Sequence, residues 1–339
     1  MSPSNTHIDR RFSIAPMLDW TDRYCRGFHR ILTKQSLLYT EMVTTGALIH
    51  GDVERHLRFS PQEHPLALQL GGSCPEDLAK CSELAEQYGY DEVNLNVGCP
   101  SDRVQSGRFG ACLMAEPDTV ADCCASMIKA TGLPVTVKCR IGIDQQDDYS
   151  DLQTFVHKVA EAGVTTFIVH ARKAWLNGLS PKQNRDIPPL NYQRVYLLKQ
   201  EFPELEIILN GGVQSIAEAK QHLAHVDGVM MGRAAYQSPH ILRTVDEDIF
   251  AKPVCDITES ELIQQLCNYI DGHLTEGAQL KYITRHIVGL FQNRPGARQW
   301  RRYLSENAYA PDAGIEVVQQ AAAFITHMAY DNDTKTPIS

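Results

Sequence analysis

The sequence lacks the segments that would direct a protein into or across a membrane. It contains no run of about 18 apolar residues, so no membrane-spanning helix is expected. Residues 1–11 are polar and include no apolar stretch of the kind found in a secretory signal peptide. We therefore expect a cytoplasmic protein without a membrane segment.

Closely spaced cysteine pairs are also missing. The chain has 10 cysteines, but no two of them are spaced as Cys-x-x-Cys. This absence argues against a zinc finger or a dithiol redox motif, and we predict no metal site. In a reducing compartment most of these thiols are expected to be small core residues. Position along the chain must therefore indicate whether any one cysteine is catalytic.

The chain has no excess of basic residues, since its net charge is −9. A protein that binds nucleic acid through bulk charge is basic, so any contact with RNA must come from a local patch. Residues 281–302 contain six lysines and arginines and no Asp or Glu. Arg298, Arg301 and Arg302 are spaced to share one helix face. Trp300, in the same segment, could pack the helix or stack on a base.

Short apolar runs rich in β-branched residues alternate with helical patterns. They predict eight strands, at 12–15, 37–41, 65–70, 92–96, 135–139, 166–170, 206–210 and 228–231. This alternation predicts an α/β fold, a (β/α)8 TIM barrel. A doubly wound sheet is the alternative architecture, but it seldom needs eight such units. Residues 173–190 show no strand pattern and are expected to form a long functional loop.

Helical periodicity without strand patterns follows the last predicted strand. The change predicts a catalytic barrel domain at 1–245 and a small C-terminal helical domain at 246–330. The polar residues 331–339 are expected to form a disordered tail.

The active site of such a barrel lies at the C-terminal ends of its strands. Glycines follow the seventh and eighth predicted strands, where barrels bind phosphate through backbone N–H groups. Gly211, Gly212 and Gly232 could do this, with Arg233 adding positive charge, or they could simply form tight turns. The occurrence of the pattern after both strands favours phosphate binding.

Lys138 lies near the end of a strand rich in β-branched residues, where a charge is costly unless it is paired. It could stabilise the negative charge of a reduced flavin, or form an ion pair with an acid such as Glu41. Gln69 offers a donor and an acceptor that match the amide-like edge of a flavin or pyrimidine. His170 could bind a ligand or have a structural role.

Cys99 stands apart from the other cysteines because of its position. It follows Gly98 and precedes Pro100, just beyond the predicted strand that ends at Asn96, which is not a core position. A thiol far from other charges is mostly protonated at neutral pH. Cys99 could therefore act as a general acid and donate a proton.

Several segments at these strand ends match the motifs of one enzyme family. They are Ala15-Pro16-Met17-Leu18-Asp19, Gln69-Leu70-Gly71-Gly72, Asn94-Leu95-Asn96-Val97-Gly98-Cys99-Pro100, Gly110-Ala111-Cys112-Leu113-Met114, Val137-Lys138-Cys139-Arg140, Leu209-Asn210-Gly211-Gly212 and Gly228-Val229-Met230-Met231-Gly232-Arg233. Together they resemble the tRNA-dihydrouridine synthases, and the segment around Cys99 is the most specific of them. Residues 173–185 and 294–302 resemble the A subfamily.

The resemblance implies an oxidoreductase that converts uridines 20 and 20a of the tRNA D-loop to dihydrouridine, with FMN as cofactor and NADPH as reductant. Hydride would pass from flavin N5 to C6 of uracil, and Cys99 would protonate C5. The implied FMN contacts are Pro16, Met17, Leu18, Gln69, Lys138, His170, Asn210, Gly211, Gly212, Gly232 and Arg233. The implied tRNA contacts are Asn96, Lys182, Arg185, Arg298 and Arg301. We expect the chain to act as a monomer.

Two other functions are compatible with parts of the sequence. An FMN barrel that acts on a free pyrimidine, as dihydroorotate dehydrogenases do, would share the flavin motifs but would not need the helical domain. An RNA-binding module with an inactive barrel would need neither Lys138 nor Cys99, so the presence of both residues argues against it.

Overall fold

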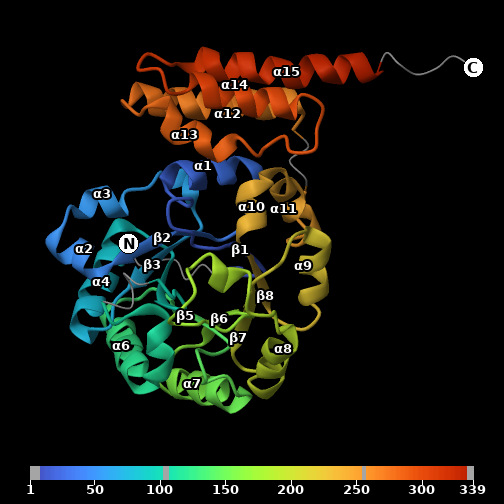
Figure 1. Cartoon of the computed structure of the whole chain (residues 1–339). Coiled ribbons are helices and arrows are strands. Elements are labelled where there is room, and N and C mark those ends of the chain that lie inside the picture. Colours follow the sequence, from blue (N-terminus) through green and yellow to red (C-terminus); the bar gives the residue numbers. More distant parts are fainter. Residues whose placement is uncertain (1–7, 102–106, 254–256, 334–339) are drawn as a thin grey trace, which may run out of the picture. The chain divides into compact units, whose positions relative to one another are not determined.

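The computed structural model describes residues 8–101, 107–253 and 257–333 (Figure 1). The chain divides into two compact units. The barrel unit comprises Met1–Thr21 and Gln35–Gly232, and the helical unit comprises Asp22–Lys34 and Arg233–Ser339. The sequence pattern predicts a domain limit between residues 245 and 246, which leaves residues 22–34 in the barrel domain.

The barrel unit contains eight parallel strands arranged in the order β1-β8-β7-β6-β5-β4-β3-β2. A backbone bridge between Ser13 and Leu37 joins β1 to the segment that leads into β2, so the two edges of the sheet meet. This arrangement confirms the predicted (β/α)8 barrel. The strands are β1 (Phe12–Ile14), β2 (Leu38–Thr44), β3 (Leu66–Gly71), β4 (Glu92–Val97), β5 (Val135–Arg140), β6 (Thr166–His170), β7 (Glu206–Asn210) and β8 (Gly228–Met231).

Strand β2 shows the largest difference from the sequence-based boundaries. It continues to Thr44, whereas the prediction ended at residue 41. Its pairing with β3 shifts register between Tyr39 and Met42, which is a bulge. The polar residues Thr40 and Glu41 interrupt the apolar pattern there, and the strand resumes on the far side of the bulge.

Helices surround the strands of the barrel unit (Figure 1). They are α2 (Thr45–His50), α3 (Val53–Leu57), α4 (Pro75–Tyr88), α6 (Pro117–Ala130), α7 (Tyr149–Glu161), α8 (Tyr192–Glu201) and α9 (Ile216–His222). Ser215 caps α9, since its side chain accepts from the backbone N–H of Glu218. Ser73 does not cap α4, because this helix begins after Cys74, which makes no side-chain cap hydrogen bond.

Short turns of 3-10 helix complete the barrel unit, at η1 (Pro61–Glu63), η2 (Gly110–Ala115) and η3 (Gln183–Arg185). The last of these is the single helical turn in residues 173–190, so this segment is the long loop that the sequence predicts. The loop joins β6 to α8, and it starts at the C-terminal end of the barrel, where the active site of such a fold lies.

The helical unit contains only helices among its described residues. They are α1 (Arg23–Leu32), α10 (Arg233–Gln237), η4 (Pro239–Thr244), α11 (Val245–Asp248), α12 (Glu259–Thr275), α13 (Leu280–Ile287), α14 (Ala297–Asn307) and α15 (Ile315–Asp333). Helix α15 extends into the predicted tail and ends at Asp333, so residues 331–333 are helical rather than disordered. The rest of that tail, 334–339, lies outside the described residues.

The core of the helical unit settles the role of Trp300. Its side chain is fully buried, packs edge-to-face on Phe291, and donates its indole N–H to the carbonyl of Ile287 at 3.2 Å. Trp300 therefore packs the helix and is not available to stack on a base. In the part of the chain that the structure describes, no helix is long and apolar enough to cross a membrane.

Candidate active site

Strand register gathers the predicted polar residues at the C-terminal edge of the barrel. Asn96 of β4 lies opposite Lys138 of β5. His170 of β6 lies between Arg140 of β5 and Asn210 of β7. Because the carboxyl ends of parallel strands meet at one edge, these side chains from four strands surround the same end of the barrel.

A buried chain of hydrogen bonds fixes the amide groups at this end. The Gln69 side chain donates from Nε2 to Asn94 Oδ1 at 2.8 Å and accepts at Oε1 from Asn96 Nδ2 at 2.9 Å. Asn94 donates in turn to the hydroxyl of Thr136 at 2.9 Å, and Thr136 donates to Glu92 at 2.7 Å. The orientations of the Gln69 and Asn96 amides are therefore set by partners on neighbouring strands.

The loop that carries Cys99 is fixed by contacts to its backbone. Asn96 Oδ1 accepts from the backbone N–H groups of Gly98, at 3.1 Å, and Cys99, at 3.0 Å. Arg140 Nε donates to the Gly98 carbonyl at 2.8 Å, and the N–H of Ala111 donates to the Cys99 carbonyl at 2.9 Å. The half-buried thiol is thereby held just beyond the end of β4.

Lys138 is a cation without a carboxylate partner among the described residues. Its Nζ donates to Asn210 Oδ1 at 3.0 Å, so the ion pair with Glu41 that the sequence left open is not formed. Burial, together with the nearby charge of Arg140, lowers the pKa of Lys138 to about 8. A buried ammonium group of this kind is suited to an anionic ligand.

Arg140 is a second buried cation, and its role was not predicted from the sequence. Burial lowers its pKa to about 10, with Cys99 opposing this effect and Arg185 and Arg172 adding to it. Besides holding Gly98, its guanidinium donates to the carbonyls of Lys173 and Asn184, both at 3.1 Å. Arg140 therefore joins the Cys99 loop to residues 173–190. A second cation two residues after Lys138 on the same strand was the available sequence clue.

The turn after β7 requires glycine. Gly211 and Gly212 have φ angles of 112° and 79°, in the region that disfavours other residues. A Cβ atom on Gly211 would lie 2.7 Å from the His170 ring, and one on Gly212 would lie 2.6 Å from the Tyr192 hydroxyl. Asn210 donates to the Met230 carbonyl at 2.8 Å and so links this turn to β8, which Gly232 follows.

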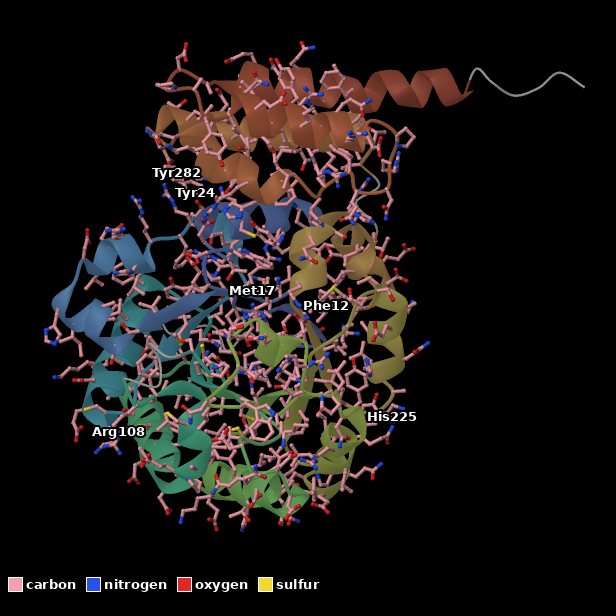
Figure 2. All side chains as sticks on the ribbon, viewed as in Figure 1. Phe12, Met17, Tyr24, Arg108, His225 and Tyr282 are labelled. Atoms are coloured by element: carbon pink, nitrogen blue, oxygen red, sulfur yellow. The ribbon has the colours of Figure 1, made fainter. Side chains whose placement is uncertain are left out.

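These features fit FMN. Glycine turns after β7 and β8 give a phosphate close access to backbone N–H groups, and Lys138 offers positive charge to an anionic ring. Met17 is half-buried on the cluster that fills the barrel interior, after Pro16 at the end of β1 (Figure 2). The next residue, Leu18, is 64% exposed, which leaves an apolar side chain available to a ligand.

The structure does not bring all predicted residues into one unit. Lys182 and Arg185 are exposed on the 173–190 loop of the barrel unit. Arg233 begins α10, and Arg298 and Arg301 are exposed on α14, so these three belong to the helical unit.

Comparison with known proteins gives the family. The dihydrouridine synthase (Dus) family model matches residues 13–326. The chain belongs to the dihydrouridine synthase family. Enzymes of this family use FMN and NAD(P)H.

Several relatives within this family are named tRNA-dihydrouridine(20/20a) synthase. The one from Vibrio parahaemolyticus is 62% identical over 316 residues, which cover 93% of this chain and 97% of the relative. The one from Yersinia pestis is 61% identical over 324 residues, or 95% and 94% of the two chains. The one from Shewanella oneidensis is 58% identical over 315 residues, or 93% and 94%. The resemblance seen in the sequence is thereby confirmed, while the roles of individual residues stay predictions.

Proposed function

We propose that this chain reduces the C5–C6 double bond of uridines 20 and 20a in tRNA to give 5,6-dihydrouridine. The observation that carries the proposal is the Cys99 loop, which Asn96 and Arg140 hold in place beyond the end of β4, next in the sheet to the strand that carries Lys138. Family membership and the names of the relatives give the substrate.

The residues that would hold FMN divide by the part of the cofactor that they suit. Gly211, Gly212 and Gly232 would hold the phosphate, with Arg233 adding charge. Gln69 would pair with the edge of the ring, and Lys138 would face its anionic side. Pro16, Met17, Leu18, His170 and Asn210 would complete the site. When bound and reduced by NADPH, FMN supplies the hydride for C6 of uracil.

Cys99 supplies the proton in this proposal. Its S–H bond breaks as a C–H bond forms at C5 of uracil, so the electron pair of the former double bond ends in the new C–H bond. The thiolate that remains takes a proton from solvent in the next cycle.

Asn96 can contact the target nucleotide in only one way that preserves its contacts within the protein. Its Oδ1 already accepts two backbone N–H groups, and its Nδ2 donates once to Gln69. An amide nitrogen carries two hydrogens, so one donor is left for a carbonyl of uracil. Lys182, Arg185, Arg298 and Arg301 would contact phosphates elsewhere on the tRNA. We further propose that the enzyme works as a monomer in the cytoplasm, where its substrate is found.

Reduction of an unmodified tRNA transcript tests the proposal. The purified protein, with FMN and NADPH, is expected to introduce dihydrouridine at positions 20 and 20a, as mapped by chemical cleavage or mass spectrometry. Reduction of free uracil or orotate without reduction of tRNA would contradict it. Cells that lack the protein should lose dihydrouridine at the same two positions.

A further inference from the structure

Two helices of the helical unit each present a cation followed by a tyrosine. Helix α1 begins with Arg23 and Tyr24, and α13 contains Lys281 and Tyr282 near its start. The two helices pack against each other. Figure 2 labels Tyr24 and Tyr282 at the same end of this unit. We call these four residues the basic tyrosine patch.

A contact between the two helices fixes the patch. Asp22, which caps α1, accepts from Arg285 of α13 at 2.6 Å and contacts His286 at 3.0 Å. Arg285 lies one turn beyond Lys281 and Tyr282, so the start of α1 is held beside the same region of α13. Both tyrosines are therefore displayed on packed helices rather than on a loop.

The rings and cations of the patch lie close together. The Arg23 guanidinium lies 4.7 Å from the centroid of the Tyr24 ring and donates to its hydroxyl at 2.9 Å. The Lys281 ammonium lies 5.1 Å from the centroid of the Tyr282 ring. Tyr24 is half-buried, with its ring against the edge of His273, whereas Tyr282 is 48% exposed. Tyr282 thus offers an accessible aromatic surface beside positive charge.

Two acids next to the patch, Asp22 and Glu276, are engaged by other side chains. Asp22 contacts Arg285 and His286, and Glu276 contacts His273 at 3.3 Å. Neither Arg23 nor Lys281 forms an ion pair with any of the described residues. In a chain with a net charge of −9, two cations without acidic partners beside an exposed ring are a local feature that favours an anionic, aromatic partner.

We propose that the basic tyrosine patch binds the tRNA substrate, with Tyr282 stacking on an unstacked base and with Arg23 and Lys281 contacting phosphates. This inference rests on the proposed function and extends it to a further part of the tRNA. Base–aromatic stacking beside basic residues is how proteins commonly hold single-stranded or looped RNA. Trp300 cannot serve this purpose, because it is buried in the core of the unit.

A second exposed tyrosine, Tyr309, allows a test of whether the effect is specific to Tyr282 or common to any exposed tyrosine of the helical unit. Among the described aromatic residues of the helical unit, Tyr309 is also strongly exposed, at 66%. It follows α14 and has no cation over its ring among the described contacts. Tyr309→Ala is therefore the control for Tyr282→Ala, and exposed Lys252 of the same unit gives the control Lys252→Ala for Lys281→Ala.

The experiment measures tRNA affinity of the full-length, FMN-loaded enzyme at several salt concentrations. Tyr282→Ala is expected to weaken tRNA binding about 5-fold or more at every salt concentration, with an unchanged salt slope, because stacking is not electrostatic. Tyr282→Phe keeps the ring and should restore binding. Lys281→Ala should lower the salt slope by about one. All variants should keep wild-type FMN content and kcat, so the loss should appear in KM for tRNA.

Either of two results would contradict the proposal that the basic tyrosine patch binds tRNA. One is wild-type tRNA affinity of both Tyr282→Ala and Lys281→Ala, and the other is an equal loss in Tyr309→Ala. If the wild-type enzyme then still forms dihydrouridine in tRNA, the proposed function stands and the patch alone fails. A wild-type enzyme that neither binds nor reduces tRNA would overturn both. A surface that binds an acidic protein needs only its positive charge and not the ring of Tyr282. If tRNA affinity does not depend on Tyr282, the proposed stacking role is therefore wrong.

Discussion

Cys99 differs from the buried cysteines in its exposure and in the hydrogen bonds that fix its backbone. Cys81, Cys123, Cys124 and Cys139 are buried, and burial raises their pKa values above the ordinary range of a thiol. Cys99 is half-buried, and its backbone N–H and carbonyl are both hydrogen-bonded. The fold therefore fixes the position of the thiol and leaves it accessible, as a proton donor requires.

Substitution of Cys99 should separate catalysis from binding. Cys99→Ala is expected to keep the yellow flavin and tRNA affinity but to lose about 100-fold or more in turnover, the usual range for a general acid. Single-turnover reoxidation of the reduced flavin by tRNA measures this loss. Cys74→Ala, at another half-buried cysteine, is the control and should retain full activity. Wild-type turnover of Cys99→Ala would refute the donor role.

The charge state of Lys138 should determine how the affinity for FMN depends on pH. Burial lowers its pKa to about 8, so the ammonium form is present below that pH and is lost as pH rises through it. An anionic cofactor binds better to the charged form. FMN affinity of the wild type, measured by quenching of flavin fluorescence, should therefore fall above about pH 8.

The same shift has an opposite consequence for the protein without cofactor. The folded-state pKa of Lys138 lies below the unfolded value, so the unfolded chain binds more protons between about pH 8 and pH 10.5. The contribution of this residue to stability should therefore increase with pH across that window.

Lys138→Met should bind FMN more weakly and should lack the fall in affinity above pH 8. An unchanged pH profile in this variant would contradict the assignment.

Some of these residue roles are readable in the sequence, and others depend on contacts that the sequence does not display. Lys138 can be recognised because a charged side chain in a strand of β-branched residues is costly unless it is paired or binds a ligand. Asn96 was predicted only as a nucleotide contact, yet its side chain also accepts two N–H groups of the Cys99 loop. The role of Arg140 was missed, because it depends on carbonyls of two loops that lie far apart in sequence.

At the scale of elements, the long loop after β6 is organised around Asn184. This side chain is fully buried, accepts from the N–H of Trp175 at 2.8 Å, and donates to the carbonyls of Trp175 and Leu179. The backbone carbonyl of Asn184 also accepts from Arg140. The exposed residues Lys182 and Arg185 therefore stand on a loop with a defined conformation.

Removal of this side chain should loosen the loop while the barrel stays folded. Asn184→Ala leaves the backbone groups of Trp175 without their partner, at a cost of about 1–3 kcal/mol. The loop should then be cleaved faster by protease, and KM for tRNA should rise while FMN content is unchanged. Gln183→Ala, at the adjacent exposed position, is the matched control. Equal protease sensitivity of the two variants would contradict this role of Asn184.

Element boundaries were predictable where the apolar pattern is uninterrupted. The limits of β6, β7 and β8 agree with the sequence-based ones, because buried parallel strands appear as short apolar runs with clear ends. Polar residues at the bulge in β2 interrupt its apolar run, so the predicted end of this strand was wrong. Ser is a frequent N-cap residue, yet α4 begins after Cys74 and not after Ser73.

At the scale of the whole molecule, the two compact units were only partly predictable. Residues 246–330 are continuous in sequence and show helical periodicity, which predicts most of the helical unit. Helix α1 follows β1 directly, yet it packs with α12 and α13 of the helical unit. Sequence periodicity identifies a helix but does not identify its packing partners when they lie more than 200 residues away in the chain.

Charge is distributed unevenly over the sequence and along α14. The net charge is −9, but α14 presents Arg298, Arg301 and Arg302 to solvent. Arg302 forms an ion pair with Glu306 at 2.8 Å, whereas neither Arg298 nor Arg301 has an acidic partner among the described residues. The two unpaired arginines are therefore the ones expected to contact phosphate.

Arg298→Ala and Arg301→Ala should each weaken tRNA binding at low salt and lower the salt slope by about one. Arg302→Ala should have a smaller effect, because its charge is already offset by Glu306. Filter binding of tRNA from low to high salt provides the measurement for all three variants. If Arg302→Ala reduced affinity as much as the other two, net charge rather than specific phosphate contacts would explain the binding. If all three variants bound tRNA with wild-type affinity at low salt, α14 would be excluded as a tRNA-docking face.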